Sequence, residues 1–244
     1  MRDDVVMTRH LLVLADSLAF HGPVDTQAPT HPDLYPNVCA RALGTDVKVD
    51  LVARFGWTAR DAWWALTRDP MAFGVYVNRA DYLILGVGGM DHLPAAVPTW
   101  LRDSIPYVRP GSLRRWVRRT YRLAAPKVIA ASGGRMRQLP QQGTDRYLTR
   151  IVAAVRHYRP GIPIALVGPS AHAAPSYPSH RHHRLAVIAG LKWSRAYGVE
   201  FVDVDNWVVP SLAAGTGNPD GIHWAWSVHE SLGSALAIAL TGPR

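Results

Sequence analysis

Short apolar runs that alternate with helix-length segments constrain the fold of this chain more than any other feature. Such runs predict buried strands, at residues 10–15, 47–53, 81–87, 164–167 and 200–204. Apolar periodicity and helix-start residues predict helices between them, at residues 34–43, 58–67, 93–104, 112–125, 145–158, 182–197 and 227–240. Alternation of this kind is typical of an α/β fold, a parallel sheet with helices on both faces.

Length and composition favour one domain with its own core. The chain has 244 residues, 48% of them hydrophobic, and α/β folds of this length are common as single units. No apolar run approaches the ~18 residues of a membrane span. The run at residues 11–14 is also too short for the core of a signal peptide. Cys39 is the only cysteine, so no internal disulfide can form, and we expect a cytoplasmic location.

Positive charge is concentrated in one part of the chain. The formal net charge is +9, and residues 102–137 alone carry ten basic side chains against Asp103. Such a segment attracts anionic partners, and a phosphorylated carrier such as coenzyme A, an acidic sugar or nucleic acid would suit it. A solvated helix face that keeps the protein soluble is an equally good explanation. No nucleic-acid-binding motif accompanies the charge, so we expect no nucleic-acid partner.

Reactive residue types follow the strands at the positions where a parallel sheet binds its ligands. Ser17 follows the first strand, Gly56 the second and Gly89 the third, while Asp220 and His223 precede the last helix. The carboxyl ends of parallel strands share one edge, so these residues should meet in one crevice. A serine nucleophile needs a base, and a histidine base needs an orienting carboxylate. The chain therefore predicts a Ser17–His223–Asp220 triad without a metal or cofactor, with backbone N–H groups of Ser17 and Gly56 as an oxyanion hole.

These segments resemble the sequence blocks of the SGNH hydrolases, the GDSL-type esterases. The first block is Ala-Asp-Ser-Leu at residues 15–18, the second is Gly56, the third is Gly-Gly-Met-Asp at 88–91, and the fifth is Asp-Gly-Ile-His at 220–223. They stand in the family's order and span nearly the whole chain. The resemblance implies a flavodoxin-like three-layer sandwich with a five-stranded parallel sheet. It assigns the nucleophile to Ser17, the base to His223 and the carboxylate to Asp220.

Two residues depart from the family pattern. Ala15 replaces the usual glycine of the first block, which is a mild change. Met90 stands where the family has an asparagine that donates its side-chain amide to the oxyanion, and methionine cannot donate. The loss of one such donor can cost ~10²–10³ in rate. Three alternatives remain open: backbone donors suffice, the Gly89 N–H or His92 takes over, or the activity is tuned away from hydrolysis.

Longer runs narrow the resemblance to the diglucosylglycerate octanoyltransferases of methylglucose lipopolysaccharide biosynthesis. These runs include LLVLADSLAFHGP, GGMDHLP, YVRPGSLRRWVRR and GNPDGIHW. The resemblance implies transfer of an octanoyl group from a coenzyme A or carrier-protein thioester to a hydroxyl of a glucosylglycerate acceptor. An esterase or thioesterase on the same fold is the alternative, and a non-catalytic binding protein is a third reading.

An inserted segment at about residues 101–143 follows the third block and ends in a loop at 132–143. We expect its helix to be capped by Ser112, with Leu113 and Trp116 among the side chains of its apolar side. It could cover the crevice, hold an acyl chain, and bind phosphates or the glycerate carboxylate. Several of the residues that could contact the substrate suit structural roles equally well. The seven candidates are Trp57, Met90, Asp91, His92, Trp224, Trp226 and Arg115.

Overall fold

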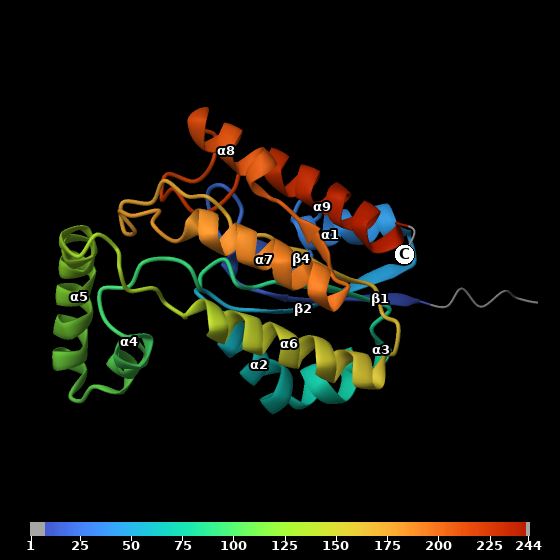
Figure 1. Ribbon diagram of the computed structural model, residues 1–244, viewed down its shortest axis with the longest axis horizontal. Coiled ribbons are helices and arrows are strands. Elements are labelled where there is room, and N and C mark those ends of the chain that lie inside the picture. Colours follow the sequence, from blue (N-terminus) through green and yellow to red (C-terminus); the bar gives the residue numbers. More distant parts are fainter. Residues whose placement is uncertain (1–7, 243–244) are drawn as a thin grey trace, which may run out of the picture.

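The five predicted strands form one parallel sheet in the order β2-β1-β3-β4-β5. The computed structural model describes residues 8–242. Figure 1 shows the strands running side by side through the middle of the molecule. Their bounds are Arg9–Ala15 (β1), Val47–Ala53 (β2), Tyr82–Gly86 (β3), Ile164–Val167 (β4) and Glu200–Val202 (β5). This is the fold class expected from the alternation of apolar runs and helical segments.

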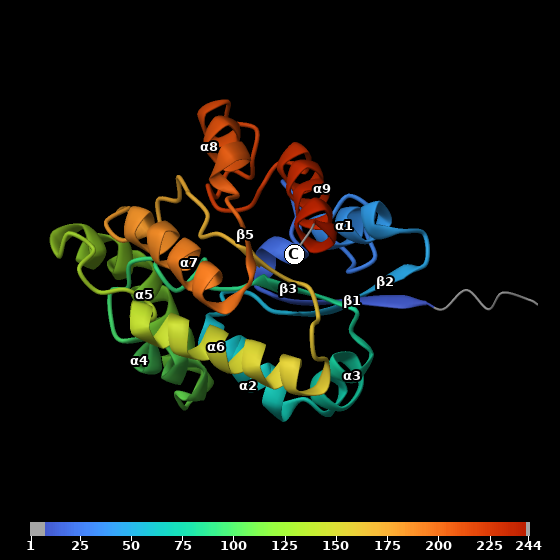
Figure 2. The ribbon, with the colours of Figure 1, turned by 45° about the vertical axis from the view of Figure 1, so that its right-hand side comes forward.

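Helices cover both faces of the sheet. The longer helices are α1 (Tyr35–Leu43), α2 (Ala59–Arg68), α5 (Gly111–Ala131), α6 (Gln141–Tyr158), α7 (His183–Tyr197), α8 (Asp205–Ala213) and α9 (Trp226–Thr241). The shorter ones are α3 (Val77–Arg79), α4 (Thr99–Ser104), the 3₁₀ turns Ser17–Ala19 and Ile105–Tyr107, and a π-helical turn at Ala72–Tyr76. In Figures 1 and 2, α1, α8 and α9 lie on one side of the sheet, and α2, α3 and α6 lie on the other.

Each face of the sheet has its own apolar core because successive side chains of a strand point to opposite faces. Leu11 and Val13 of β1 pack in the core beneath α1, α8 and α9. Leu12 and Leu14 pack in the core beneath α2, α6 and α7. All four side chains have no exposed surface. Burial on both sides fixes the register of β1 and hence the position of the residues that follow it.

The structure differs from the sequence-based expectation in four segments. The expected helix at 93–104 begins only at Thr99, because Pro94 and Pro98 disfavour helical backbone at the preceding residues. The expected helix at 112–125 runs from Gly111 to Ala131 through Pro126, and its N-cap is Pro110 rather than Ser112. The expected loop at 132–143 already contains the start of α6 at Gln141. Helix α8 was not expected, since Pro210 lies inside it.

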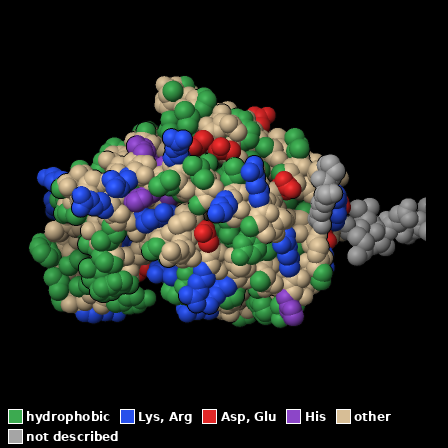
Figure 3. All heavy atoms as spheres, in the orientation of Figure 1, with side chains coloured by type: hydrophobic (Ala, Val, Ile, Leu, Met, Phe, Trp, Pro, Cys, Tyr) green, Lys and Arg blue, Asp and Glu red, His purple; other side chains and the backbone are tan. Residues whose placement is uncertain are grey.

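Helices α4 and α5, with the turn between them, form an arm at residues 99–131 that lies beyond the carboxyl ends of the strands (Figures 1 and 2). Only Ala125 and Ile129 of α5 are buried. Trp116 is 63% exposed and Leu113 is 43% exposed, so the expected apolar side of this helix does not pack against the body. Figure 3 shows hydrophobic side chains gathered over this arm. Within residues 8–242, no helix is both long and apolar enough to cross a membrane.

Candidate active site

Ser17 lies where β1 ends and a 3₁₀ turn begins, at the carboxyl edge of the sheet. The preceding residue, Asp16, holds this turn because its carboxylate accepts a hydrogen bond from the Leu18 N–H at 2.9 Å. Asp16 is buried, and burial raises its pKa to about 7 against the opposing effect of the Leu18 N–H. Asp16 thus acts on the shape of the turn, and Ser17 itself is only 5% exposed.

A hydrogen-bonded chain joins the three residues of the expected triad. The Ser17 Oγ lies 3.1 Å from the His223 Nε2, and the His223 Nδ1 lies 2.6 Å from the Asp220 Oδ2. A carboxylate can only accept, so Nδ1 carries the proton and Nε2 is left as the acceptor for the serine hydroxyl. The arrangement is the one that a histidine base needs in order to activate a serine.

The surroundings of His223 and Asp220 shift the pKa values of both side chains. Burial lowers the pKa of His223, while the Asp220 carboxylate partly offsets that effect. Partial burial of Asp220 is outweighed by the backbone N–H groups of Ile222 and His223, which donate to its carboxylate and lower its pKa. At neutral pH the histidine is therefore neutral and the aspartate charged, which are the states that a base and its orienting group require.

Aromatic rings enclose the triad histidine. The His21 ring stacks on the His223 ring with 3.7 Å between centroids and 19° between planes. The Phe55 ring meets the His223 ring edge-on at 6.3 Å and the Phe20 ring at 5.0 Å. His21 and Phe55 were not among the sequence candidates. The signals in the sequence that could have identified them were their positions, four residues after Ser17 and one residue before Gly56.

The first three sequence blocks meet beside Ser17. Gly56 has a φ of +67°, a conformation that favours glycine, and a Cβ placed on it would lie 4.0 Å from the Met90 Cε. A Cβ placed on Gly89 would lie 4.0 Å from the Asp16 Oδ2. Met90 is 9% exposed, so its thioether fills the space between the second and third blocks.

Asp91 holds the third block against helix α2. Its carboxylate accepts hydrogen bonds from the Ala59 N–H at 3.1 Å and from the Thr144 hydroxyl at 2.7 Å. The Ala59 N–H belongs to the first turn of α2 and has no partner within the helix. Burial raises the pKa of Asp91 to about 7, although both hydrogen bonds oppose the shift. Asp91 is 1% exposed, so its place is structural and it offers substrate no open surface.

His92, itself buried, takes part in a second hydrogen-bonded chain with His183 and Asp205, which are half-buried. The His92 Nε2 lies 3.2 Å from the His183 Nδ1, and the His183 Nε2 lies 2.6 Å from the Asp205 Oδ2. The other Asp205 oxygen accepts a hydrogen bond from the Ala171 N–H at 2.7 Å. Burial lowers the pKa of His92 to about 3. The chain ties the third block to α7, α8 and the loop at 169–179, a long-range pairing that local patterns do not reveal.

The remaining candidates lie in four different settings. Trp224 is 3% exposed and donates from its indole to the Ser170 hydroxyl at 3.1 Å, so it offers no open face to a sugar. Trp57 is half-buried, and the guanidinium of Arg54 lies over its ring at 5.8 Å. The Trp226 ring stacks on His31 at 4.9 Å. Arg115 is exposed on the arm.

Comparisons with known proteins show which proteins are similar to this chain. No protein-family model matches the chain. A "Diglucosylglycerate octanoyltransferase" from Mycobacterium tuberculosis is 39% identical over 231 residues, which cover 94% of this chain and 91% of the relative. Another protein of that name, from Mycolicibacterium hassiacum, is 40% identical and covers 94% of each chain.

Solved structures share the fold at low sequence identity. A lipase/acylhydrolase from Enterococcus faecalis superposes with a TM-score of 0.62 at 14% identity, covering 95% of each chain. The protein TesA superposes with a TM-score of 0.59 at 16% identity, covering 96% of this chain and 98% of its own. These similarities establish the SGNH hydrolase fold.

Proposed function

Because the chain belongs to the diglucosylglycerate octanoyltransferase family, we propose that it transfers an octanoyl group from an acyl thioester to a hydroxyl of diglucosylglycerate. The observation that supports the proposal is the hydrogen-bonded chain of Ser17, His223 and Asp220, because this is the arrangement that a histidine base needs to activate a serine. The donor is octanoyl-coenzyme A or an octanoyl carrier protein, and the location is the cytoplasm.

In the first half-reaction, the Ser17 Oγ attacks the thioester carbonyl carbon while its proton passes to the His223 Nε2. The carbonyl oxygen becomes an oxyanion, and the backbone N–H groups of Ser17, Gly56 and Gly89 are its proposed donors. Collapse of this intermediate breaks the C–S bond, and the leaving thiolate takes the proton from His223. The product is an octanoyl ester of Ser17.

In the second half-reaction, His223 takes the proton of the acceptor hydroxyl as the sugar oxygen attacks the ester carbon. Collapse breaks the bond to the Ser17 Oγ, which recovers the proton from His223. Water could attack the same ester, so transfer requires that the sugar be held in place and water be excluded. The side chain of Met90 favours such exclusion because it puts an apolar group beside Gly56 where the family places a polar amide.

Mass spectrometry of the intact protein and of the products tests the proposal. Octanoyl-coenzyme A is mixed with the wild type or with Ser17→Ala, with and without diglucosylglycerate. We expect an octanoyl adduct on the wild type alone, and octanoylated sugar formed faster than free octanoate. Free octanoate at the same rate with and without acceptor would instead identify a thioesterase, the second function that this triad supports. Sugar octanoylation by Ser17→Ala at the wild-type rate would refute the acyl-enzyme.

A further inference from the structure

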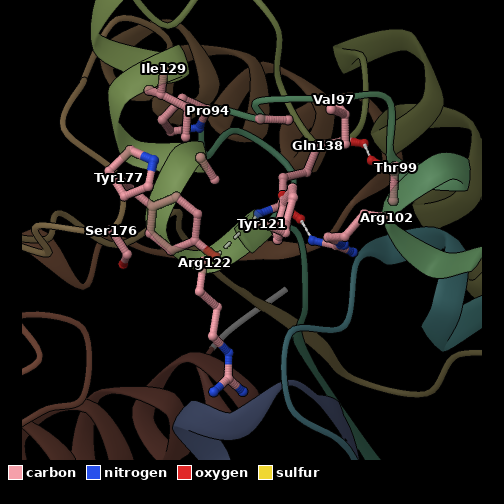
Figure 4. A pocket seen from close by; sticks show the side chains of 13 residues that line it. Pro94, Val97, Thr99, Arg102, Tyr121, Arg122, Ile129, Gln138, Ser176 and Tyr177 are labelled. Atoms are coloured by element: carbon pink, nitrogen blue, oxygen red, sulfur yellow. Dashed lines mark hydrogen bonds between the residues drawn. The ribbon is translucent and has the colours of Figure 1, made fainter. Parts of the chain in front are cut away.

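A cavity of about 430 Å³ lies between the α4–α5 arm and the body of the protein (Figure 4). The two buried residues of α5, Ala125 and Ile129, form part of its wall. Pro94 and Val97 line it from the segment after the third block, and Tyr177 lines it from the loop at 169–179. The cavity is thus built where the arm, the third block and that loop come together.

Four of the polar residues that line the cavity, Thr99, Arg102, Gln138 and Tyr177, pair with one another, and most of the remaining lining residues are apolar. The Gln138 side chain accepts a hydrogen bond from Arg102 and donates one to the Tyr177 hydroxyl at 3.5 Å. The Gln138 carbonyl accepts one from the Thr99 hydroxyl. Figure 4 shows Arg122 extending away from the other lining side chains. A sugar would need free polar partners, whereas an alkyl chain needs only apolar surface.

Two of the segments that line the cavity are connected to the candidate active site. Pro94 follows the third-block residue Asp91 by three positions. On the other side, the Ala173 N–H donates to the Gly221 carbonyl at 2.8 Å, and Gly221 lies between Asp220 and His223. Tyr177 is four residues beyond Ala173. The cavity wall is therefore connected to the third block on one side and, through one hydrogen bond, to the loop of Asp220 and His223 on the other.

We propose that this cavity, between the α4–α5 arm and the third-block segment, takes the alkyl chain of the transferred acyl group. The inference rests on the proposed function and names a subsite for it. At about 30 Å³ per water-sized group, an eight-carbon chain fills roughly 240 Å³, which the cavity accommodates. Each methylene that enters contributes about fourfold to binding, since its burial is worth ~0.8 kcal/mol.

Serine-reactive alkyl fluorophosphonates test the inference without an acyl donor. Ser17 displaces fluoride from these probes, and intact-protein mass spectrometry measures the labelling rate. We compare an octyl with an ethyl probe on the wild type, on Ala125→Phe, which fills the cavity, and on Ala130→Phe. Ala130 is an exposed neighbour on the same helix, so it controls for added bulk. We expect the octyl-to-ethyl ratio to fall at least about tenfold in Ala125→Phe and to stay at the wild-type value in Ala130→Phe.

An unchanged ratio in a folded Ala125→Phe would overturn the inference. If Ala125→Phe does not fold, Val97→Phe decides, because Val97 lines the same cavity at a half-buried position: the octyl-to-ethyl ratio should again fall, and an unchanged ratio would overturn the proposal. Failure of the proposed function looks different, because neither probe would then label Ser17, or Ser17 would be labelled while octanoyl transfer is absent.

Discussion

The body and the arm contain helices of similar length that make very different contacts. Helix α6 of the body has 18 residues, and five of them, including Leu148 and Ile151, are buried. Helix α5 of the arm has 21 residues, of which two are buried. Both helices have an apolar side in the sequence. Periodicity thus shows that a helix has an apolar face, but it does not show whether the protein itself covers that face.

The proposed catalytic site belongs to the body, so the largest effects should follow changes there. Asp220→Asn is expected to lower kcat/KM for octanoyl transfer about 10⁴-fold, the scale measured for the equivalent loss in serine proteases. The carboxylate also raises the pKa of His223, so its removal should move the acid limb of the pH profile to lower pH. The pH dependence of kcat/KM and the thermal midpoint would be measured together. A lower midpoint with an unmoved acid limb would mean that Asp220 only supports the loop.

Truncation of a side chain should lower the free energy of unfolding more in the body than in the arm, because the body has a packed core. Ile151→Ala leaves a cavity at a side chain with no exposed surface and should cost about 2–5 kcal/mol of unfolding free energy. Leu123→Ala on α5 removes a side chain that is 66% exposed and should cost less than about 0.5 kcal/mol. Urea unfolding of both variants checks this. Equal losses would show that the exposed face of the arm is covered in solution.

Buried carboxyl groups make the stability of the body depend on pH. Burial raises the pKa of Asp91 to about 7, well above the ~3.9 of an unfolded chain. The protonated group therefore contributes stability that is present below pH ~3.9 and lost as the pH rises through about 7. Relative to the wild type, Asp91→Asn should gain thermal stability between pH 5 and 8. Asp103→Asn, at an exposed site on the arm, is the control, and parallel curves for the wild type and Asp91→Asn would contradict the assignment.

The smallest expected effect concerns the arginines of the arm. Arg115→Ala should leave the unfolding free energy within about 0.5 kcal/mol and raise the KM for octanoyl-coenzyme A about threefold, the scale of one exposed charge contact. Arg195→Ala, which removes an exposed arginine of α7, should leave that KM unchanged. Initial rates at low salt measure both. Equal KM values for the two variants would show that Arg115 does not contact the acyl donor.

Local patterns were sufficient for the parts of the protein in which neighbouring residues act together. The apolar runs located all five strands, and the spacing of Asp220 and His223 on one turn located their contact. The His92–His183–Asp205 chain joins segments far apart in the sequence, and no local signal pairs them. The helix expected at 93–104 was shortened by Pro94 and Pro98, a signal that was present in the sequence but outweighed by apolar periodicity.

The hydrogen bond from Ala173 to Gly221 connects the loop that contributes Tyr177 to the cavity wall with the loop that carries Asp220 and His223. Any ligand that restrains Tyr177 also restrains, through this loop, the segment that carries Asp220 and His223. Thermodynamic linkage is reciprocal: if an occupied cavity favours the imidazolium of His223, then protonation of His223 tightens the hold on the occupant by the same factor. The affinity of the cavity for its ligand and the proton affinity of His223 would then both report the same coupling free energy.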